Sequence, residues 1–294
     1  MNLAAIDVGS NAARVLIMAV EPRNNSLKFQ KLKLLRYPLR LGVEVFLHGH
    51  ISTTKTRELT KMLRAFKLFM QLYNVEHYMA FATSAMREAA NGAEVIKGVK
   101  NKTQIDLKTI DGLTEASILY QTHFEKTLSK RKGYIYVDVG GGSTEASIFT
   151  AGKLKESQSF KIGTLRMLHE LVGKPEVQVM TKWIKKKAKT KDNFSGIASG
   201  GNINSIFQLS KKQSPISLPY LKYMRQEIKT LTIEERMARY SFKPDRAEVI
   251  IPALNLYIAA FKAAGVTDIY VPKIGLADGM VRILARKIFQ PANT

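Results

Sequence analysis

One short pattern occurs twice in this chain, and the repeat constrains the fold more than any other feature. Residues 7–14 align without gaps on residues 138–145. In both copies an apolar run ends in Asp-Val-Gly, a turn of mostly small residues follows, and a second run returns. This order predicts a strand, a tight turn and a returning strand. Because 294 residues suffice for two medium domains, the repeat predicts two similar halves with a cleft between them.

In each half, strand-like runs come first and are followed by alternating helical and strand-like segments, which predicts an α/β protein with mixed sheets. We expect first-half strands at 3–8, 12–20, 27–36, 78–82 and 105–110, a helix capped within 52–54 and running to Leu72, and helices at 93–99 and from a Thr114 cap to about 127. We expect second-half strands at 134–139, 145–149, 194–198 and 266–271, and helices after Asn202 and at 218–238, 246–264 and 277–289.

A basic, polar stretch at 126–133 predicts the boundary between the halves. We therefore expect one domain at 1–125 and a second at 126–294. The last helix, about 277–289, is the one element that we expect could pack back on the first domain.

Charge and composition restrict the kinds of function. The chain has no cysteine, which excludes disulfide scaffolds, cysteine-based zinc sites, iron–sulfur clusters and thiol catalysis. A net charge of +22 favours an anionic partner. The lysine-rich stretches at 97–108 and 182–191 are typical of solvated helix faces, although we favour a track for a polyanion.

Other classes of partner leave no sign in the sequence. It contains no zinc finger and no run typical of an RNA-recognition motif, so nucleic acid is not the expected partner. No apolar run approaches the roughly 18 residues of a spanning helix, and the N-terminus resembles a core strand rather than a signal peptide. We expect a soluble, cytoplasmic protein without a membrane partner, and we leave a homodimer open.

The two repeated turns are the main candidate site. A glycine-rich turn directs backbone N–H groups at an anion, and an Asp at the end of the preceding strand can hold a hydrated Mg²⁺. Asp138 with 140–144, and Asp7 with 9–11, therefore predict two facing cradles for phosphate and metal. A plain hairpin explains one such turn equally well, but two at equivalent places favour the functional interpretation.

Three further features could contribute to the same site. Ser199-Gly200-Gly201-Asn202 follows a strand and opens a helix, which is either an anion-binding helix start or an ordinary turn. Arg87 could bind a phosphate bidentately or lie solvated on a short helix capped by Thr83 or Ser84. Glu115 could complement the positive end of its helix or act as a general base toward water.

The motifs together resemble the exopolyphosphatase/guanosine pentaphosphate phosphohydrolase (Ppx/GppA) family over nearly the whole chain. The matching segments are Ala5–Asn11 with Arg14, Arg40–Gly42, Ala82–Arg87 with Asn91, Gly112–Tyr120, Val137–Glu145, Gly163–Arg166, Ser199–Asn202, Arg246–Pro252 and Gly275-Leu276. Their order and spacing are far more specific than any one glycine turn.

The resemblance implies a duplicated ribonuclease-H-like fold, the actin-like ATPase fold, and hydrolysis of a terminal phosphate with Mg²⁺. It implies that Glu115 is catalytic and that Asp138 and Glu145 serve the metal and the water; we add Asp7 as a metal candidate. The phosphate-binding residues that we expect from the turns and the resemblance are Ser10, Asn11, Arg87, Gly141, Gly142, Ser143, Thr144, Gly200 and Gly201.

Some positions depart from the family's usual pattern. Thr114 precedes Glu115 where an acidic residue is common, Val43-Glu44 replaces Glu-Gly, and Ala253 replaces Gly. The late Gly-Leu-Arg-Glu-Gly motif is Gly275-Leu276-Ala277-Asp278-Gly279 here and lacks the arginine. These departures bear on substrate preference more than on fold.

The leading hypothesis is an exopolyphosphatase that releases orthophosphate from the end of inorganic polyphosphate. The alternatives are a guanosine pentaphosphate 5′-phosphohydrolase with the same machinery, a polyphosphate-binding regulator with weak catalysis, and an actin-like kinase or chaperone ATPase. We place the last of these behind the others because no adenosine-binding stretch is recognisable.

Overall fold

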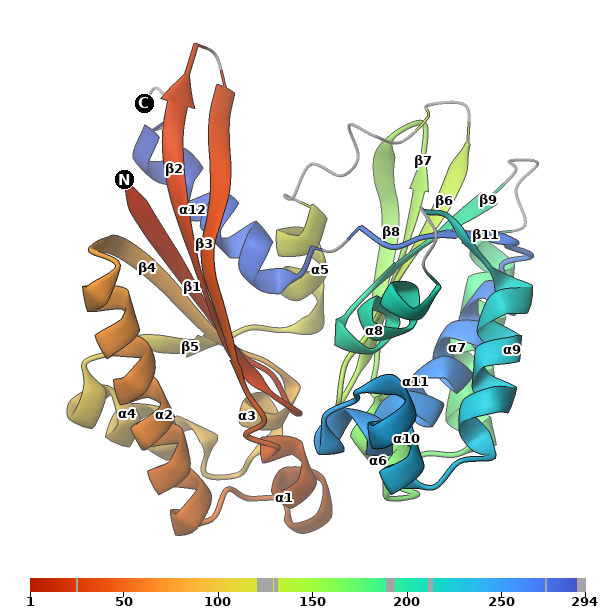
Figure 1. The fold of residues 1–294 in the computed structure, drawn as a ribbon, viewed down its shortest axis with the longest axis horizontal. Coiled ribbons are helices and arrows are strands. Elements are labelled where there is room, and N and C mark those ends of the chain that lie inside the picture. The colour runs from red at the N-terminus through yellow and green to blue at the C-terminus, as the bar shows by residue number, and fades with distance from the viewer. Residues whose placement is uncertain are drawn as a thin grey trace. The chain divides into compact units, whose positions relative to one another are not determined.

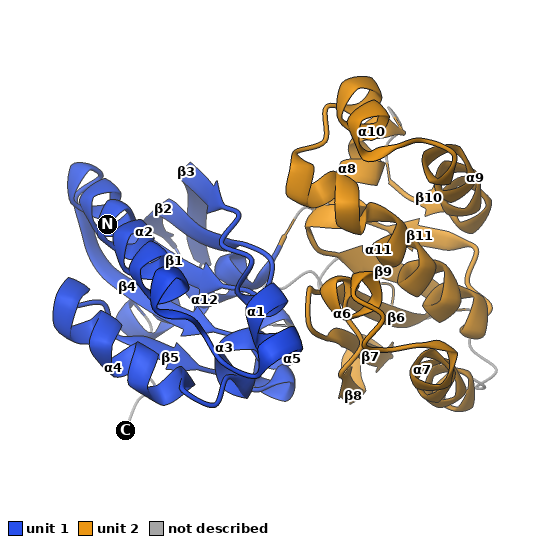
Figure 2. Ribbon diagram, turned by 90° about the horizontal axis from the view of Figure 1, so that it is seen from below, with its two compact units in different colours: residues 1–122, 275–294 blue, residues 123–274 orange. Residues whose placement is uncertain are grey.

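The computed structural model describes residues 1–24, 26–120, 129, 132–188, 194–210, 214–272 and 274–289. The chain divides into two compact units (Figure 2). Unit 1 comprises Met1–Thr122 and Gly275–Thr294, and unit 2 comprises His123–Ile274. The boundary expected at 125/126 lies outside the described residues, as does most of the basic stretch that follows it.

Unit 1 is built on a five-stranded sheet in the order β3-β2-β1-β4-β5. Its strands are β1 (Asn2–Val8), β2 (Ala13–Arg23), β3 (Ser26–Tyr37), β4 (Val75–Ala82) and β5 (Leu107–Thr109). Its helices are α1 (Leu41–His48), α2 (Thr53–Leu72), α3 (Ser84–Glu88), α4 (Gly92–Thr103), α5 (Gly112–Tyr120) and α12 (Leu276–Phe289). β1 pairs antiparallel with β2 and parallel with β4, so it lies in the middle of the sheet.

Both faces of this sheet are covered, which explains why Leu3 through Val8 are all buried. One face carries the alternate side chains Ala4, Ile6 and Val8 and packs with α2 and α4, while Leu3 and Ala5 contact the other core with α12. α2 begins where the sequence predicts, because the Ser52 side chain accepts a hydrogen bond from the Lys55 amide.

Unit 2 is built on a six-stranded sheet in the order β10-β11-β9-β6-β7-β8. Its strands are β6 (Gly133–Val139), β7 (Thr144–Thr150), β8 (Lys153–Phe160), β9 (Phe194–Ser199), β10 (Ile216–Ser217) and β11 (Asp268–Tyr270). Its helices are α6 (Thr164–Leu168), α7 (Lys174–Lys187), α8 (Gly201–Leu209), α9 (Leu218–Lys229), α10 (Ile233–Tyr240) and α11 (Pro244–Ala263). Figure 1 traces both sheets and their helices.

The two sheets share one topology. Reading β8-β7-β6-β9-β11 against β3-β2-β1-β4-β5 gives the same order of antiparallel and parallel neighbours. The repeated turns also close with equivalent hydrogen bonds, from Gly9 N to Ala12 O at 3.1 Å and from Gly140 N to Ser143 O at 2.9 Å. The duplicated α/β fold predicted from the repeat is therefore confirmed, and the cleft between the halves stays a prediction.

Two of the predicted helices were wrong in detail. α5 begins at Gly112 rather than after a Thr114 cap, because the Asp111 carboxylate accepts a hydrogen bond from the Thr114 amide at 2.7 Å. The helix predicted at 218–238 is two helices, α9 and α10. The second starts afresh at Thr232, where a reciprocal capping box with Glu235 forms.

The sequence did not predict several elements, among them α1, β8, α6, α7 and β10. The lysine-rich stretch from 182 continues α7, whose last turn carries three lysines; residues 189–193 lie outside the described part. Within the described ranges, none of the helices combines the length and apolar character that crossing a membrane requires.

Candidate active site

The turn between β6 and β7 places two carboxylates opposite each other. Asp138 and Glu145 are register partners in this antiparallel pair. Directly opposed residues project from the same face of a sheet with their Cβ atoms about 5 Å apart. Asp138 is partly exposed, whereas Glu145 is buried and accepts a hydrogen bond from Ser159 Oγ at 2.9 Å. Like charges at such positions repel unless a cation or further donors offset them.

The peptide carbonyls of this turn are held by one segment, residues 164–166 at the start of α6. Thr164 N donates to Gly140 O at 3.0 Å, Leu165 N donates to Gly141 O at 2.9 Å, and Arg166 Nε donates to Gly142 O at 2.8 Å. A trans peptide directs its C=O and N–H to opposite sides. The amides of 141–143 therefore point away from this segment together, which is the arrangement of an anion-binding nest.

Gly163 is the residue that lets this segment approach the turn. A Cβ atom there would lie 2.3 Å from Gly141 O and 2.5 Å from Gly142 N, so any side chain would displace the turn. Thr144, by contrast, is already engaged, because its hydroxyl donates to Ile162 O at 2.6 Å. Within unit 2 the structure thus brings together Asp138, Glu145 and the predicted turn of 141–144.

The second glycine pair of unit 2 lies beside the same turn. Gly200 adopts φ +111°, a conformation that favours glycine, and a Cβ on it would lie 3.0 Å from Asp138 Oδ1 and 3.1 Å from the Tyr257 hydroxyl. Gly201 opens α8, and a Cβ on it would lie 2.7 Å from both terminal nitrogens of Arg246. The first amides of a helix lack intrahelical acceptors. Gly200 and Gly201 therefore join the group around Asp138.

Arg246 and Tyr257 also belong to this group, although neither is among the site residues that the sequence predicts. Arg246 Nη1 donates to Asn202 Oδ1 at 3.1 Å. A signal for Arg246 existed, since it opens one of the matching motifs. Tyr257 carried no signal, because its place in a helix of apolar pattern predicts a core residue. Burial, followed by the nearby charge of Asp138, raises the pKa of Tyr257 well above its usual value.

In unit 1 the equivalent turn carries an ion pair instead of two carboxylates. Asp7 pairs in register with Arg14, and Arg14 Nη1 lies 3.0 Å from Asp7 Oδ2. Burial raises the pKa of Asp7, and the adjacent Arg14 guanidinium partly offsets that rise. The assignment of Asp7 to a metal stays a prediction, and the partner that the structure shows is Arg14.

Ser10 and Asn11 form the tip of this turn. Gly42 N donates to Ser10 O at 2.8 Å and Arg40 N donates to Asn11 O at 2.9 Å, so the following amides point away from α1 as they do in unit 2. The Ser10 hydroxyl lies 2.7 Å from Ser84 Oγ and accepts a hydrogen bond from Ala85 N at 3.2 Å. This side chain therefore fastens the turn to α3.

Arg87 belongs to α3, and its guanidinium group reaches the start of α5, the helix that carries Glu115. Its Nη1 donates to Ile110 O, directly before the Asp111 cap. Hydrogen bonds from Thr114 lower the pKa of Asp111, and the charge of Arg87 contributes. Glu115 lies one turn into α5, partly exposed, and its amide donates to Asp111 O at 3.0 Å. Unit 1 thus brings Arg87 to the N-terminal end of the Glu115 helix.

Two departures from the family pattern have structural roles here. Glu44 accepts hydrogen bonds from Ser52 N at 2.9 Å and Ser52 Oγ at 3.0 Å, which ties α1 to the start of α2. Asp278, in the altered late motif, accepts from Gly275 N at 3.0 Å and pairs with Lys31 at 2.6 Å. Both acidic side chains stabilise helix starts within unit 1.

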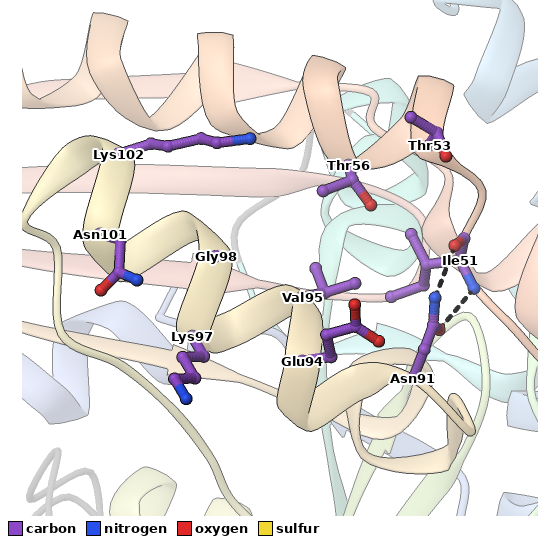
Figure 3. Close-up of a pocket in the computed structure, with 10 residues that line it drawn as sticks. All are labelled: Ile51, Thr53, Thr56, Asn91, Glu94, Val95, Lys97, Gly98, Asn101 and Lys102. Atoms are coloured by element: carbon purple, nitrogen blue, oxygen red, sulfur yellow. Dashed lines mark hydrogen bonds between the residues drawn. The ribbon is translucent and has the colours of Figure 1, made fainter.

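A separate groove of about 370 Å³ lies on unit 1 between α2 and α4 (Figure 3). Its lining residues are Ile51, Thr53, Thr56, Asn91, Glu94, Val95, Lys97, Gly98, Asn101 and Lys102. None of the predicted site residues lines this groove. Across the part of the chain that the structure describes, no three His, Asp or Glu residues cluster in a way that could hold a metal by themselves.

The sequence pattern of the Ppx/GppA phosphatase family matches residues 20–287 of the chain. The chain belongs to the Ppx/GppA phosphatase family. This membership identifies it as an enzyme of the phosphoanhydride hydrolase class.

Relatives and solved structures agree with this family. The chain is similar to exopolyphosphatase 1 of Mycobacterium tuberculosis, with 22% identity over 96% of this chain and 87% of that protein. It is 28% identical to a bifunctional 3-dehydroquinate synthase/phosphatase of Fusobacterium nucleatum over 71% of this chain, and it spans only 34% of that protein's length.

Two solved structures of the family share the fold. The exopolyphosphatase of Cytophaga hutchinsonii superposes with a TM-score of 0.83 at 22% identity, covering 98% of both chains. The Aquifex aeolicus member superposes with a TM-score of 0.77 at 23% identity, covering 99% of both chains. The actin-like fold that the resemblance implied is therefore confirmed for this Ppx/GppA phosphatase.

Proposed function

We propose that this Ppx/GppA phosphatase is an exopolyphosphatase that releases orthophosphate from the end of inorganic polyphosphate. The observation that carries the proposal is the 140–143 turn beside Asp138, in which the carbonyls of 140–142 are held on one side and the amides of 141–143 point to the other. Such a turn suits a phosphoryl group with oxygens on several sides. The similarity to exopolyphosphatases supports the polymer as substrate.

The side chains of unit 2 fit a magnesium ion. Asp138 and Glu145 are directly opposed carboxylates, and Mg²⁺ binds through one or two carboxylates together with water and substrate phosphates. We assign the metal to these two residues, with Asp7 of unit 1 as a further candidate. When bound, Mg²⁺ would neutralise charge on the phosphate oxygens.

We assign the remaining steps to the chain's own groups. In unit 2 we assign the terminal phosphoryl group to the amides of the 141–143 turn, the first amides of α8 and the guanidinium group of Arg246. In unit 1 we assign phosphate binding to the turn at Ser10 and Asn11 and to Arg87. Glu115 orients a water and accepts its proton while the water oxygen attacks phosphorus. The bond from phosphorus to the bridging oxygen then breaks, and the shortened polyphosphate leaves with that oxygen. Positioning and charge stabilisation supply most of the rate in such a reaction.

A phosphate-release assay tests the proposal. Polyphosphate, guanosine pentaphosphate and ATP are compared side by side with and without Mg²⁺, and we expect Mg²⁺-dependent release from polyphosphate above the other two. Faster release from guanosine pentaphosphate would assign the nucleotide as substrate instead. Tight, salt-sensitive binding of polyphosphate without release would identify a binding regulator. The homodimer and the cytoplasmic location stay predictions.

A further inference from the structure

The hydroxyl of Tyr257 joins the ends of two parallel strands. Tyr257 lies fully buried in α11. Its hydroxyl donates to the carbonyl of Ser199, the last residue of β9. The same hydroxyl accepts a hydrogen bond from the amide of Val139, the last residue of β6, at 3.4 Å. One side chain from a helix therefore bridges two strands of the sheet.

This bridge lies where the regular pairing of the two strands stops. β6 and β9 are parallel neighbours, and their last paired residues are Asp138 and Ser199. Directly beyond, Gly140 and Gly200 begin the two glycine-containing turns. Among the described residues, the backbone atoms that the Tyr257 hydroxyl bonds lie immediately before these turns, so the hydroxyl ties together the two points from which the turns start.

Gly200 lies close to both Asp138 and the Tyr257 hydroxyl. The Cβ position of Gly200 is 3.1 Å from the Tyr257 oxygen and 3.0 Å from Asp138 Oδ1. The ring of Tyr257 needs no hydroxyl to pack, because it belongs to the apolar core of unit 2 and stacks on Phe261 with centroids 6.3 Å apart. A phenylalanine would fill the same space, yet the residue here carries an oxygen that bonds at the turns.

We propose that Tyr257 is a positioning residue that sets the spacing between the Asp138–Ser143 turn and the start of α8, and thereby the fit of unit 2 to a phosphoryl group and its metal. The inference rests on the proposed function for its catalytic consequence. Its structural part, the bridge itself, can be tested independently.

The test compares Tyr257→Phe with Tyr136→Phe. Tyr136 is also a buried tyrosine, and its hydroxyl donates to the Ser199 side chain rather than to the backbone of either turn. Both variants lose one buried hydroxyl and keep their ring. For Tyr257→Phe we expect kcat/KM on polyphosphate to fall about tenfold, the factor that corresponds to one ordinary hydrogen bond. Most of the loss should appear as a higher KM, because turn amides bind phosphate in both the ground and the transition state.

Hydrogen exchange followed by mass spectrometry supplies a readout without substrate. In Tyr257→Phe the peptides that contain 139–143 and 199–202 should exchange faster than in the wild type, while the rest of unit 2 stays unchanged. We expect the melting temperature of Tyr136→Phe to fall by about as much as that of Tyr257→Phe. In Tyr136→Phe, however, kcat/KM and the exchange of the 139–143 peptide should be unaltered.

The outcomes separate the inference from the proposed function. If the wild type releases phosphate and Tyr257→Phe matches it in KM and in exchange of both turns, the positioning role is refuted. Equal losses of kcat/KM in the two variants would also refute it, since any buried hydroxyl would then serve. A wild type that releases no phosphate would overturn the proposed function, whereas faster exchange at both turns would still support the bridge.

Discussion

Asp138 and Glu145 face each other across β6 and β7 at the register position that Asp7 and Arg14 occupy in unit 1. The duplicated backbone thus carries a carboxylate pair in one copy and an ion pair of 3.0 Å in the other. Unit 1 neutralises its acid internally. In unit 2 the two opposed carboxylates are the residues to which we assign a divalent cation in the proposed function.

The first prediction concerns this carboxylate pair. Asp138→Asn should weaken Mg²⁺ binding by at least about tenfold, because a ligand to the ion is replaced by a neutral amide. Calorimetric titration with Mg²⁺ alone measures this without turnover. Glu156→Gln is a suitable control, since Glu156 lies on β8 of the same unit and pairs with Lys187 at 2.7 Å. Equal Mg²⁺ affinity in wild type and Asp138→Asn would remove Asp138 from the metal site.

The second prediction separates a general base from a charge that merely complements a helix. Glu115→Gln should lower kcat on polyphosphate by about 10² to 10⁴ while polymer binding stays close to normal. Glu94→Gln is the matched control, because Glu94 lies in the first turn of α4, as Glu115 lies in the first turn of α5. If both variants retain wild-type turnover, Glu115 serves only its helix.

The third prediction concerns the close contact beneath the phosphate turn. Gly163→Ala should destabilise the protein by about 1–3 kcal/mol and impair polyphosphate hydrolysis, because its Cβ would overlap the Gly141 carbonyl. Gly98→Ala is the control within α4. No atom lies within 4 Å of a Cβ there, so we expect stabilisation of up to about 1 kcal/mol. Urea unfolding of both variants measures these values, and a fully active Gly163→Ala would show that the turn can move without consequence.

The fourth prediction concerns the pH dependence at the start of the Glu115 helix. The pKa of Asp111 is lowered in the folded state, chiefly by hydrogen bonds from Thr114. Because the pKa in the folded state lies below the unfolded value of 3.8, the ionised Asp111 carboxylate stabilises the fold at pH values above 3.8. This stabilisation is lost as the pH falls through the folded-state pKa. Asp111→Asn keeps an acceptor and removes the charge. The difference in unfolding free energy between wild type and variant should therefore shrink as the pH falls below about 4. A difference that is constant with pH would contradict it.

The features that followed from sequence are those set by neighbouring residues. The repeated strand-turn-strand units, the Ser52 cap and the helix start at Gly201 depend on local patterns, and they lie where these patterns predict. The start of α5 did not follow, because Asp111 and Thr114 can both cap and only the fold decides between them. The bridge made by Tyr257 could not be predicted, since it joins residues 118 and 58 positions away in sequence.

The assembly of the candidate site residues likewise depends partly on contacts between residues far apart in sequence. The spacing within residues 138–145 predicts that its members lie together. It does not predict that Arg246 would approach Gly201 from a helix more than forty positions later, because that contact depends on how α11 packs against the sheet. The roles of these residues stay predictions until the variants are measured.

The discontinuity of unit 1 has a consequence for how this protein is made. Leu3, Leu16 and Val20 share a core with Met280 and Val281 of α12, which is synthesised after all of unit 2. During translation, one apolar face of the first sheet lacks the part of its cover that α12 provides, while the second unit emerges and can fold as a whole. The nascent chain therefore exposes part of an apolar sheet face through half of its synthesis. In this interval the chain is most prone to aggregate, and chaperone binding would matter most.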